Sequence, residues 1–160
     1  MAGFEFIDNC LLIKAEIEDA AVAFLHEAAG EITAQTKRNS RVDTSQTKDS
    51  YEYSVSESEL KAVIGSSLEN AVWEEFGTGE YALNHDGRKG GWYISADKLD
   101  GKTKSKFENK YHFKKVTSKD GKVFYYTKGK KPNRPFFKAA EKTKPKLKRM
   151  LESKLGGVGK

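Results

Sequence analysis

The sequence predicts an α+β fold, in which a small antiparallel β-sheet is packed by a long N-terminal helix and a C-terminal helix. Three observations favour this fold. A long stretch of helical periodicity opens the chain, alternating runs of β-type residues occupy its middle, and a helical segment that starts with a proline closes it. The 160 residues show no internal repeat, and this length is typical of one domain. We therefore expect a single domain that spans residues 1–160.

The N-terminal helix is indicated by apolar residues that recur every three or four positions up to about Lys37. Asp8 or Asn9 offers a side-chain oxygen that can cap its first turn. The apolar stripe consists of Ile13, Ile17, Ala20, Ala21, Phe24, Ala28 and Ile32. Gly30 costs about 1 kcal/mol relative to alanine inside a helix, so we expect it to mark a close contact or a bend.

The middle of the chain is predicted to hold two β-hairpins. After a polar loop at residues 39–48, two strands at residues 49–56 and 60–66 are joined by a short acidic turn. Residues 69–75 fit a short helix or a strand. Residues 84–108 are rich in Lys and Gly, so we expect a flexible loop there, with a short strand at residues 92–94. The pair Asp120-Gly121 lies between two β-rich runs and predicts the second hairpin.

The C-terminal helix is predicted to begin at Pro135, because a proline in the first turn loses no helical hydrogen bond. Pro145 is expected to interrupt this helix or to split it in two. Gly156-Gly157 should end it, and residues 156–160 are expected to be frayed.

Composition limits the class of protein. The chain is 37% hydrophobic and carries a net charge of +6, with its lysines concentrated in residues 102–160. Such a basic half attracts nucleic acid or an acidic protein face, or serves solubility alone. No apolar run approaches the length of a membrane span, and the N-terminus lacks the layout of a signal peptide. Cys10 is the only cysteine, and its apolar neighbours predict a small core residue in a protein made in a reducing cytoplasm.

The sequence offers no constellation that favours catalysis. The histidines are scattered, and the adjacent carboxylates of Glu74 and Glu75 would point to opposite faces of a strand. The glycines at 87, 90 and 91 lack the context of a phosphate-binding loop, and no His or Cys cluster has the spacing of a metal site. We expect no enzyme, no catalytic residues, no cofactor and no metal.

One segment suggests a different function. In residues 110–134, lysines and aromatic rings interleave, as on surfaces that stack bases and hold phosphates. The possible contacts with nucleic acid or an acidic partner are Lys114, Lys115, Lys128, Lys130 and Lys131. The simpler interpretation, which we favour, is a half-buried hairpin whose rings face the core and whose lysines face water.

Three short motifs mark a turn, a strand exit and a helix start. They are Val42-Asp43-Thr44-Ser45, Glu75-Phe76-Gly77-Thr78-Gly79 and Arg134-Pro135-Phe136. In this order and at these distances they resemble the gene-product-ten-like family of tailed-phage proteins, which are neck or tail-completion components of long-tailed phages. The family turn is Val-Asp-Thr-Gly, so Ser45 replaces its glycine, whereas the other two motifs match fully. Residues 87–92 and 128–132 resemble a subgroup from phages of Gram-positive hosts.

The resemblance implies a non-enzymatic virion assembly protein of a phage or prophage, which acts in tail completion and head–tail joining by subunit–subunit docking in a ring. The implied partners are other copies of the chain, the tail tube or terminator and head connector proteins, with DNA in the channel as a further contact. The implied location is the neck of the virion, after synthesis in the cytoplasm of the bacterial host. The three motifs would supply interface and structural residues, and the 84–108 loop would become ordered on a neighbour.

Overall fold

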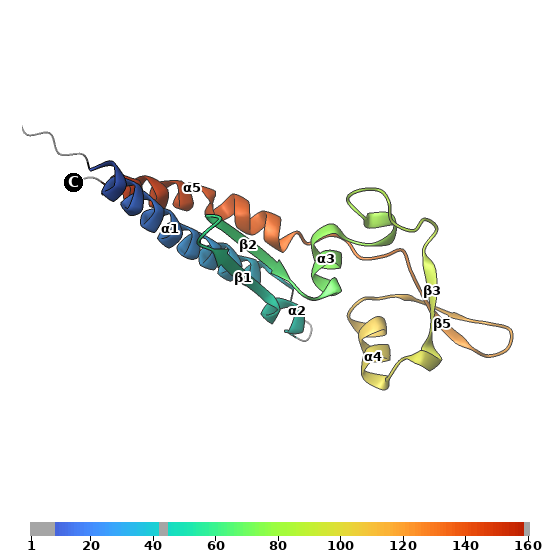
Figure 1. Cartoon of the computed structure of the whole chain (residues 1–160). Coiled ribbons are helices and arrows are strands. Elements are labelled where there is room, and N and C mark those ends of the chain that lie inside the picture. Colours follow the sequence, from blue (N-terminus) through green and yellow to red (C-terminus); the bar gives the residue numbers. More distant parts are fainter. Residues whose placement is uncertain (1–8, 42–44, 159–160) are drawn as a thin grey trace, which may run out of the picture. The chain divides into compact units, whose positions relative to one another are not determined.

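The chain forms helices and small antiparallel sheets, which confirms the predicted α+β class. A computed structural model describes residues 9–41 and 45–158. Its contacts divide the chain into two compact units (Figure 1). The first unit comprises residues 1–71 and 134–160, and the inserted unit comprises residues 72–133. The single domain expected for residues 1–160 stays a prediction.

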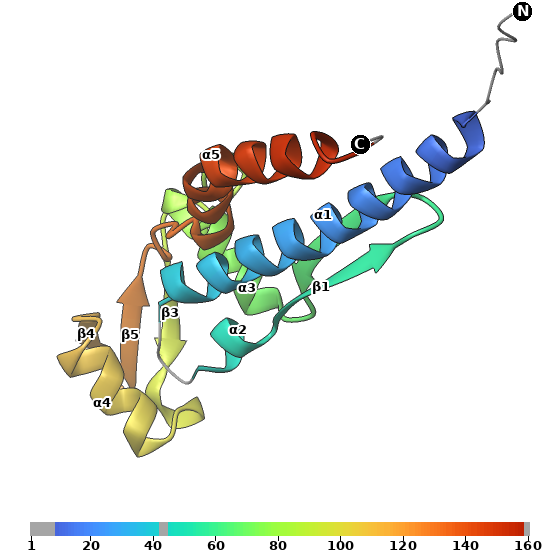
Figure 2. The same cartoon turned by 90° about the vertical axis from the view of Figure 1, so that its left-hand side faces the viewer.

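In the first unit, the long helix α1 (Cys10–Asn39) packs against α5 (Pro135–Leu155) and against a β-hairpin (Figure 2). The hairpin consists of β1 (Tyr51–Ser56) and β2 (Lys61–Ser66), which pair antiparallel from Tyr51 opposite Ser66 to Ser56 opposite Lys61. The first predicted hairpin is therefore confirmed. The predicted loop at residues 39–48 is wrong in part, because α2 (Gln46–Asp49) forms a single helical turn before β1.

Apart from Gln35, the buried residues of α1 are small, and α5 packs against this helix. Ala29 and Thr36 are 1% and 0% exposed, and Ala139 of α5 is 0% exposed. The buried hydroxyls bond within their own helices: Thr36 Oγ1 donates to the Ile32 carbonyl at 2.8 Å, and Thr143 Oγ1 donates to the Ala139 carbonyl at 2.9 Å. Neither hydroxyl therefore needs a partner on the opposite helix.

The first turns of α1 are exposed, so the prediction of a buried Cys10 is wrong. Every residue from Cys10 to Asp19 is exposed, including Ile13 and Ile17 of the predicted apolar stripe. The stripe reaches the core only further along, at Ala28. The reason is length: the contacts of α5 run along the second half of α1, with Lys154 paired to Glu27 at 2.8 Å.

Helix α5 is continuous through Pro145, which contradicts the predicted interruption. Pro145 and Glu141, whose carbonyl loses its helical partner, are both exposed, so water can satisfy that carbonyl. The helix begins at Pro135 and ends before Gly156-Gly157, and both of these predictions are confirmed. Fraying at residues 156–160 stays a prediction, and residues 159–160 lie outside the described residues.

The inserted unit holds a three-stranded antiparallel sheet of β3 (Trp92–Ser95), β5 (Val123–Thr127) and β4 (Lys114–Thr117), in that order. The hairpin of β4 and β5 around Asp120-Gly121 is confirmed. Helix α3 (Glu69–Phe76) leads into this unit, and the 3-10 turns η1 (Gly79–Tyr81) and η2 (Ala96–Lys98) flank β3. Residues 69–75 are thus helical, the first of the two predicted alternatives.

The short strand predicted at residues 92–94 is confirmed by β3, whereas the flexible loop predicted for residues 84–108 is wrong where η2 and α4 (Gly101–Asn109) form. Asp100 caps α4: its carboxylate accepts from the Thr103 amide at 2.8 Å and from the Thr103 hydroxyl at 2.9 Å. These bonds hold the pKa of Asp100 below its ordinary value. Phe107 anchors the helix, since its ring lies 4.8 Å from that of Phe113 and 5.4 Å from that of Tyr125.

Candidate assembly interface

Two segments that are far apart in the sequence lie side by side in the inserted unit, and we call residues 77–80 and 128–130 the glycine clasp. The Thr78 amide donates to the Lys130 carbonyl at 2.9 Å, and the Lys130 amide donates to Thr78 Oγ1 at 2.9 Å. The Glu80 amide donates to the Lys128 carbonyl at 2.9 Å. The clasp therefore ties the Glu-Phe-Gly-Thr-Gly segment to a segment about 50 residues later in the sequence.

The glycines of the clasp are required by how closely its two backbones approach. Gly79 and Gly129 have φ of +62° and +114°, which favour glycine. A Cβ on Gly129 would overlap the carbonyl oxygen of Thr78, and a Cβ on Gly79 would overlap that of Lys128. The Gly-Thr-Gly motif is thus one half of a backbone contact, and Lys128-Gly129-Lys130 is the other half.

A buried carboxylate joins the entry and exit of the inserted unit. Glu74, on α3, is 2% exposed. Its Oε1 accepts from Asn133 Nδ2 at 3.0 Å, and its carbonyl accepts from the Asn133 amide at 2.8 Å. From the sequence, Glu74 was interpreted only as one of two adjacent acids, and this role was missed. No local pattern could have shown it, because the partner is 59 residues away.

Helix α3 turns its apolar residues outward. Ala71 and Glu74 are buried, whereas Val72, Trp73 and Phe76 are 55%, 46% and 46% exposed. The Leu83 amide donates to the Phe76 carbonyl at 2.9 Å, which brings Leu83, itself 38% exposed, beside Phe76. We call Val72, Trp73, Phe76 and Leu83 the α3 patch. A helix that buries a carboxylate and exposes its aromatic rings is unusual for a chain without a partner.

The structure separates the five lysines proposed as partner contacts into two groups. Lys128 and Lys130 belong to the clasp and Lys131 follows it, whereas Lys114 and Lys115 lie on β4. Lys128 pairs with Glu80 at 3.1 Å, which raises the pKa of Lys128. The Lys131 ammonium lies 5.6 Å from the centre of the Tyr81 ring.

On β4, Lys115 is part of a network with α4 and β5. Its ammonium and the Tyr125 hydroxyl both donate to Glu108 Oε1, at 2.9 Å and 2.7 Å. The bond from Tyr125, followed by the bond from Lys115, lowers the pKa of the Glu108 carboxyl. The same network raises the pKa of both donors. This network holds α4 on the sheet and lines a hollow of about 390 Å³ beside Lys104 and Ser105.

The third motif, Arg134-Pro135-Phe136, lies in the first unit and starts α5. The Arg134 guanidinium stacks 3.7 Å from the centre of the Phe137 ring. Arg134 itself has a φ of +57°, in the left-handed region. Pro135 is buried, and its carbonyl accepts from Asn39 Nδ2 at 3.1 Å, so the motif ties the start of α5 to the end of α1. Phe136 is half-buried.

Of the first motif, Val42, Asp43 and Thr44 lie outside the described residues, and only Ser45 can be placed. Its φ is +61°, in the left-handed region. This is the position at which the family pattern has glycine, and a left-handed residue is where glycine is most favourable. Ser45 therefore adopts a conformation that glycine favours, at the position where the resembled motif has glycine.

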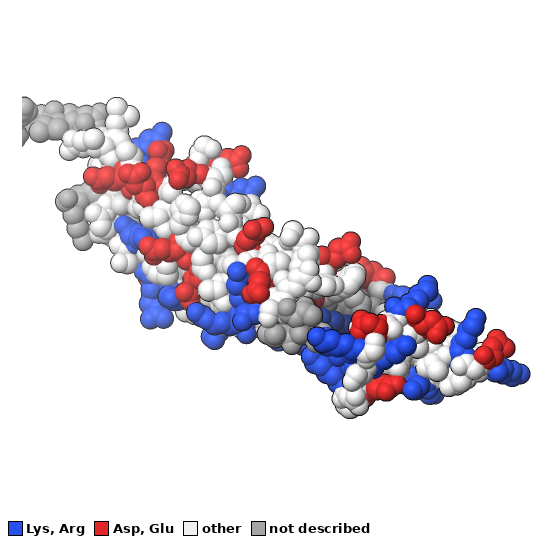
Figure 3. Space-filling view, turned by 90° about the horizontal axis from the view of Figure 1, so that it is seen from below, with Lys and Arg blue, Asp and Glu red and all other residues white. Residues whose placement is uncertain are grey.

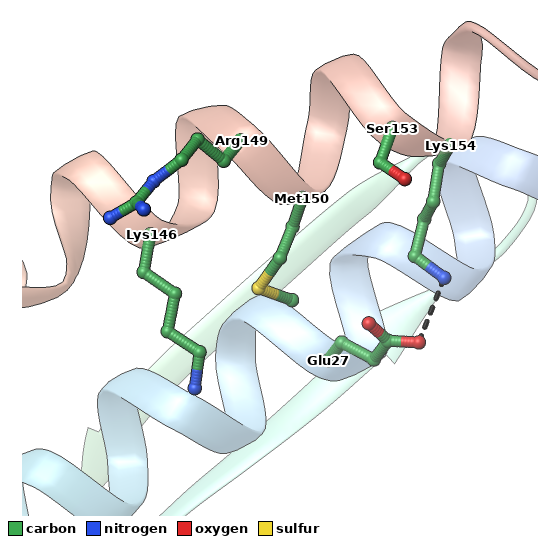
Figure 4. Close-up of a pocket in the computed structure, with 6 residues that line it drawn as sticks. All are labelled: Glu27, Lys146, Arg149, Met150, Ser153 and Lys154. Carbon is green, nitrogen blue, oxygen red and sulfur yellow. Dashed lines mark hydrogen bonds and ion pairs between the residues drawn. The ribbon is translucent and has the colours of Figure 1, made fainter.

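The acidic side of α1 is partly paired within the chain. Lys154 bonds Glu27 at 2.8 Å, and Lys146 bonds Glu31 at 2.9 Å. The bond from Lys146 lowers the pKa of Glu31. Figure 4 shows this region, an open pocket of about 430 Å³ between α1 and α5 that is lined by Glu27, Lys146, Arg149, Met150, Ser153 and Lys154. One ion pair that joins the two helices, Glu27–Lys154, lies in the lining of this pocket.

Within residues 9–41 and 45–158, no three His, Cys, Asp or Glu side chains are grouped so that they could hold a metal ion. None of the helices in the described part of the chain is long and apolar enough to cross a membrane. No family model, curated protein or solved structure matches this sequence. The resemblance to the phage family therefore rests on the motifs of the sequence.

Proposed function

We propose that this protein is a non-enzymatic assembly component of a phage virion, which completes the tail and joins it to the head as one subunit of a ring in the neck. The order and spacing of the motifs support this function. The glycine clasp and the start of α5 give two of these motifs a role in shaping surfaces. The observation that carries the proposal is the α3 patch, because exposed apolar side chains beside a rigid backbone contact are typical of protein–protein interfaces.

The partners in this proposal are further copies of the chain, the tail tube or terminator, and the head connector, with DNA passing through the channel. The protein acts in the virion after it has been made in the host cytoplasm. The residues that serve the function are those of the clasp and the α3 patch, since these combine a fixed backbone with exposed rings.

Deletion of the gene from the phage or prophage that carries it tests this function. Electron microscopy of the induced lysate should show DNA-filled heads and separate tails, because both are built before the neck joins them. A plasmid copy of the wild-type gene should restore joined particles and infectivity. Normal infectious virions from the deletion strain would overturn the proposal.

A second candidate function, nucleic-acid binding, is favoured by one face of the three-stranded sheet. Tyr93 is 61% exposed, its ring lies 5.1 Å from that of Tyr126, and Tyr126 is paired in register with Lys114. Other rings of the segment pack inward, since Tyr125 is 1% exposed. If this face binds single strands, affinity for an oligonucleotide should fall steeply with salt and drop roughly tenfold in Tyr93→Ala. Equal, weak binding by both proteins would reject it.

A further inference from the structure

The first ten residues of α1 form a second exposed apolar surface. Leu11, Leu12, Ile13 and Ile17 are 84%, 65%, 41% and 44% exposed, and we call residues 10–19 the α1 tip. They continue the stripe that is buried from Ala28 onward. At a rise of 1.5 Å per residue, Asp19 lies about 12 Å along α1 from Glu27, the residue that pairs with the last turn of α5. Figure 2 shows α1 extending beyond the end of α5.

The two exposed surfaces differ in charge. The α1 tip carries Glu16, Glu18 and Asp19 against Lys14, a net charge of −2. In Figure 3, acidic side chains gather at the upper left of the view. The inserted unit has 14 Lys and Arg against eight Asp and Glu, a net charge of +6; Lys130 belongs to its clasp, and Lys131 directly follows the clasp. The charges of the tip and of the unit that bears the α3 patch are therefore opposite.

We propose that the α1 tip of one copy docks on the α3 patch of the next copy, which deepens the proposed ring function and rests on it. Each subunit then offers one apolar, acidic surface and one apolar surface within a basic unit. Two different, mutually complementary surfaces on one chain make a head-to-tail contact, and such contacts close into rings when the rotation between copies allows it. At long range the net charges favour this contact, because tip-to-tip encounters and encounters between two inserted units bring like charges together. Helix α3 itself carries Glu69 and Glu75, so apolar contact, rather than charge within the patch, would hold the two surfaces together.

The size of the contact determines how it should be measured. Each surface exposes four large apolar side chains, far fewer than the 20–30 residues a side of a standard interface. Two copies joined by this contact alone should therefore associate weakly in solution. A complete ring should form only when the copies assemble on the tail or the head connector. A covalent trap suits such a contact, because each productive encounter is retained.

The exposed Cys10 lies in the α1 tip and supplies half of the trap. In Phe76→Cys, under an added oxidant such as dissolved oxygen with a copper catalyst, the thiol in the patch of one copy should form a disulfide with Cys10 of the next. The product is a ladder of dimers, trimers and higher species on a non-reducing gel. Val63→Cys is the matched control, since Val63 is 53% exposed but lies on β2. We expect the ladder to form at least tenfold faster in Phe76→Cys, and to slow as salt is raised. Val72→Cys serves as a second patch variant if Phe76→Cys is poorly folded.

The contact would be overturned if the ladder formed at equal rates in the patch and control variants. It would also be overturned if the product stopped at dimers linked through Cys10 alone, or if the disulfide formed within one chain. Ile13→Ser in the Phe76→Cys background should slow the ladder severalfold, because it removes an apolar contact and leaves both cysteines in place. Purified protein is used throughout, so this outcome is independent of the phage. Normal virions from the deletion strain would reject the proposed function and leave the ladder unexplained, whereas equal rates would reject only the contact.

Discussion

The glycine clasp makes a specific prediction about stability, because two glycines that both have positive φ differ strongly in what surrounds them. Gly129 has φ of +114°, and a Cβ there would overlap the Thr78 carbonyl oxygen. Gly121, in the turn between β4 and β5, has φ of +77°, and a Cβ there would meet nothing within 4 Å. Alanine at either position strains the backbone, but only Gly129→Ala forces the clasp apart.

The magnitudes follow from these surroundings. A left-handed alanine costs about 1–2 kcal/mol, so Gly121→Ala should lower the free energy of unfolding by about that amount. Gly129→Ala adds the loss of the three clasp hydrogen bonds, each worth about 1 kcal/mol. Its total cost is therefore about 4–5 kcal/mol. A unit of this size has little more stability than that, so Gly129→Ala should leave the inserted unit largely unfolded.

Two optical probes report the unfolding of the two units separately. Trp73 and Trp92 are the only tryptophans, and both lie in the inserted unit, so their fluorescence follows its unfolding by urea. The far-ultraviolet circular dichroism is dominated by α1 and α5 of the first unit. We expect a red-shifted tryptophan spectrum in Gly129→Ala with most of the helical signal retained. Equal urea midpoints for the two glycine variants would refute the clasp as described.

Three further substitutions test other parts of the fold. Gly30→Ala should raise the free energy of unfolding by about 0.5–1 kcal/mol, because it improves helix propensity and its Cβ would lie at an ordinary 3.8 Å from the Tyr53 ring; a loss of stability in urea would show that α1 and β1 are closer than described. Pro145→Ala should stabilise α5 by up to about 3 kcal/mol because it restores an amide to the helix interior, and an unchanged melting temperature would contradict this. The lowered pKa of Glu108 means that its bonds stabilise the fold above the ordinary pKa of 4.5 and that this stability is lost as the pH falls through the lower folded value. In Glu108→Gln, the free energy of unfolding, followed by tryptophan fluorescence, should therefore fall less steeply as the pH is lowered. Glu141→Gln, at an exposed site on α5, should leave this pH dependence unchanged.

The elements whose signals are local could be predicted from the sequence. The alternation around Tyr53, the Asp120-Gly121 turn and the proline at the start of α5 each depend on neighbours in the sequence, and each led to an element that forms. Helix α4 was missed because its composition is polar and rich in lysine. A signal was nevertheless present: Asp100 lies three residues before Thr103, the spacing of an N-cap bond.

The candidate site could be predicted only in part. The motif at residues 75–79 was identified, but what it contacts depends on a segment about 50 residues away. The burial of Glu74 depends on Asn133, and the exposure of Ile13 depends on where α5 ends. Periodicity shows that a helix has an apolar side, but it does not show how much of that side is covered. For that reason the apolar stripe of α1 could be identified from the sequence, while Cys10 at its start was wrongly expected to lie in the core.

The distribution of charge gives the two units different electrostatic roles. Residues 1–71 hold 13 acidic and six basic side chains, and residues 134–160 hold nine basic and two acidic ones, so the two segments of the first unit balance each other. Exposed pairs such as Glu27–Lys154 contribute little stability, but opposite charge helps to select α5 as the neighbour of α1. The inserted unit alone accounts for the net charge of +6. Long-range attraction to an acidic partner therefore acts through the unit that also carries the clasp and the α3 patch. The lysines of this unit attract the acidic partner, and the apolar side chains of the patch can then bind it.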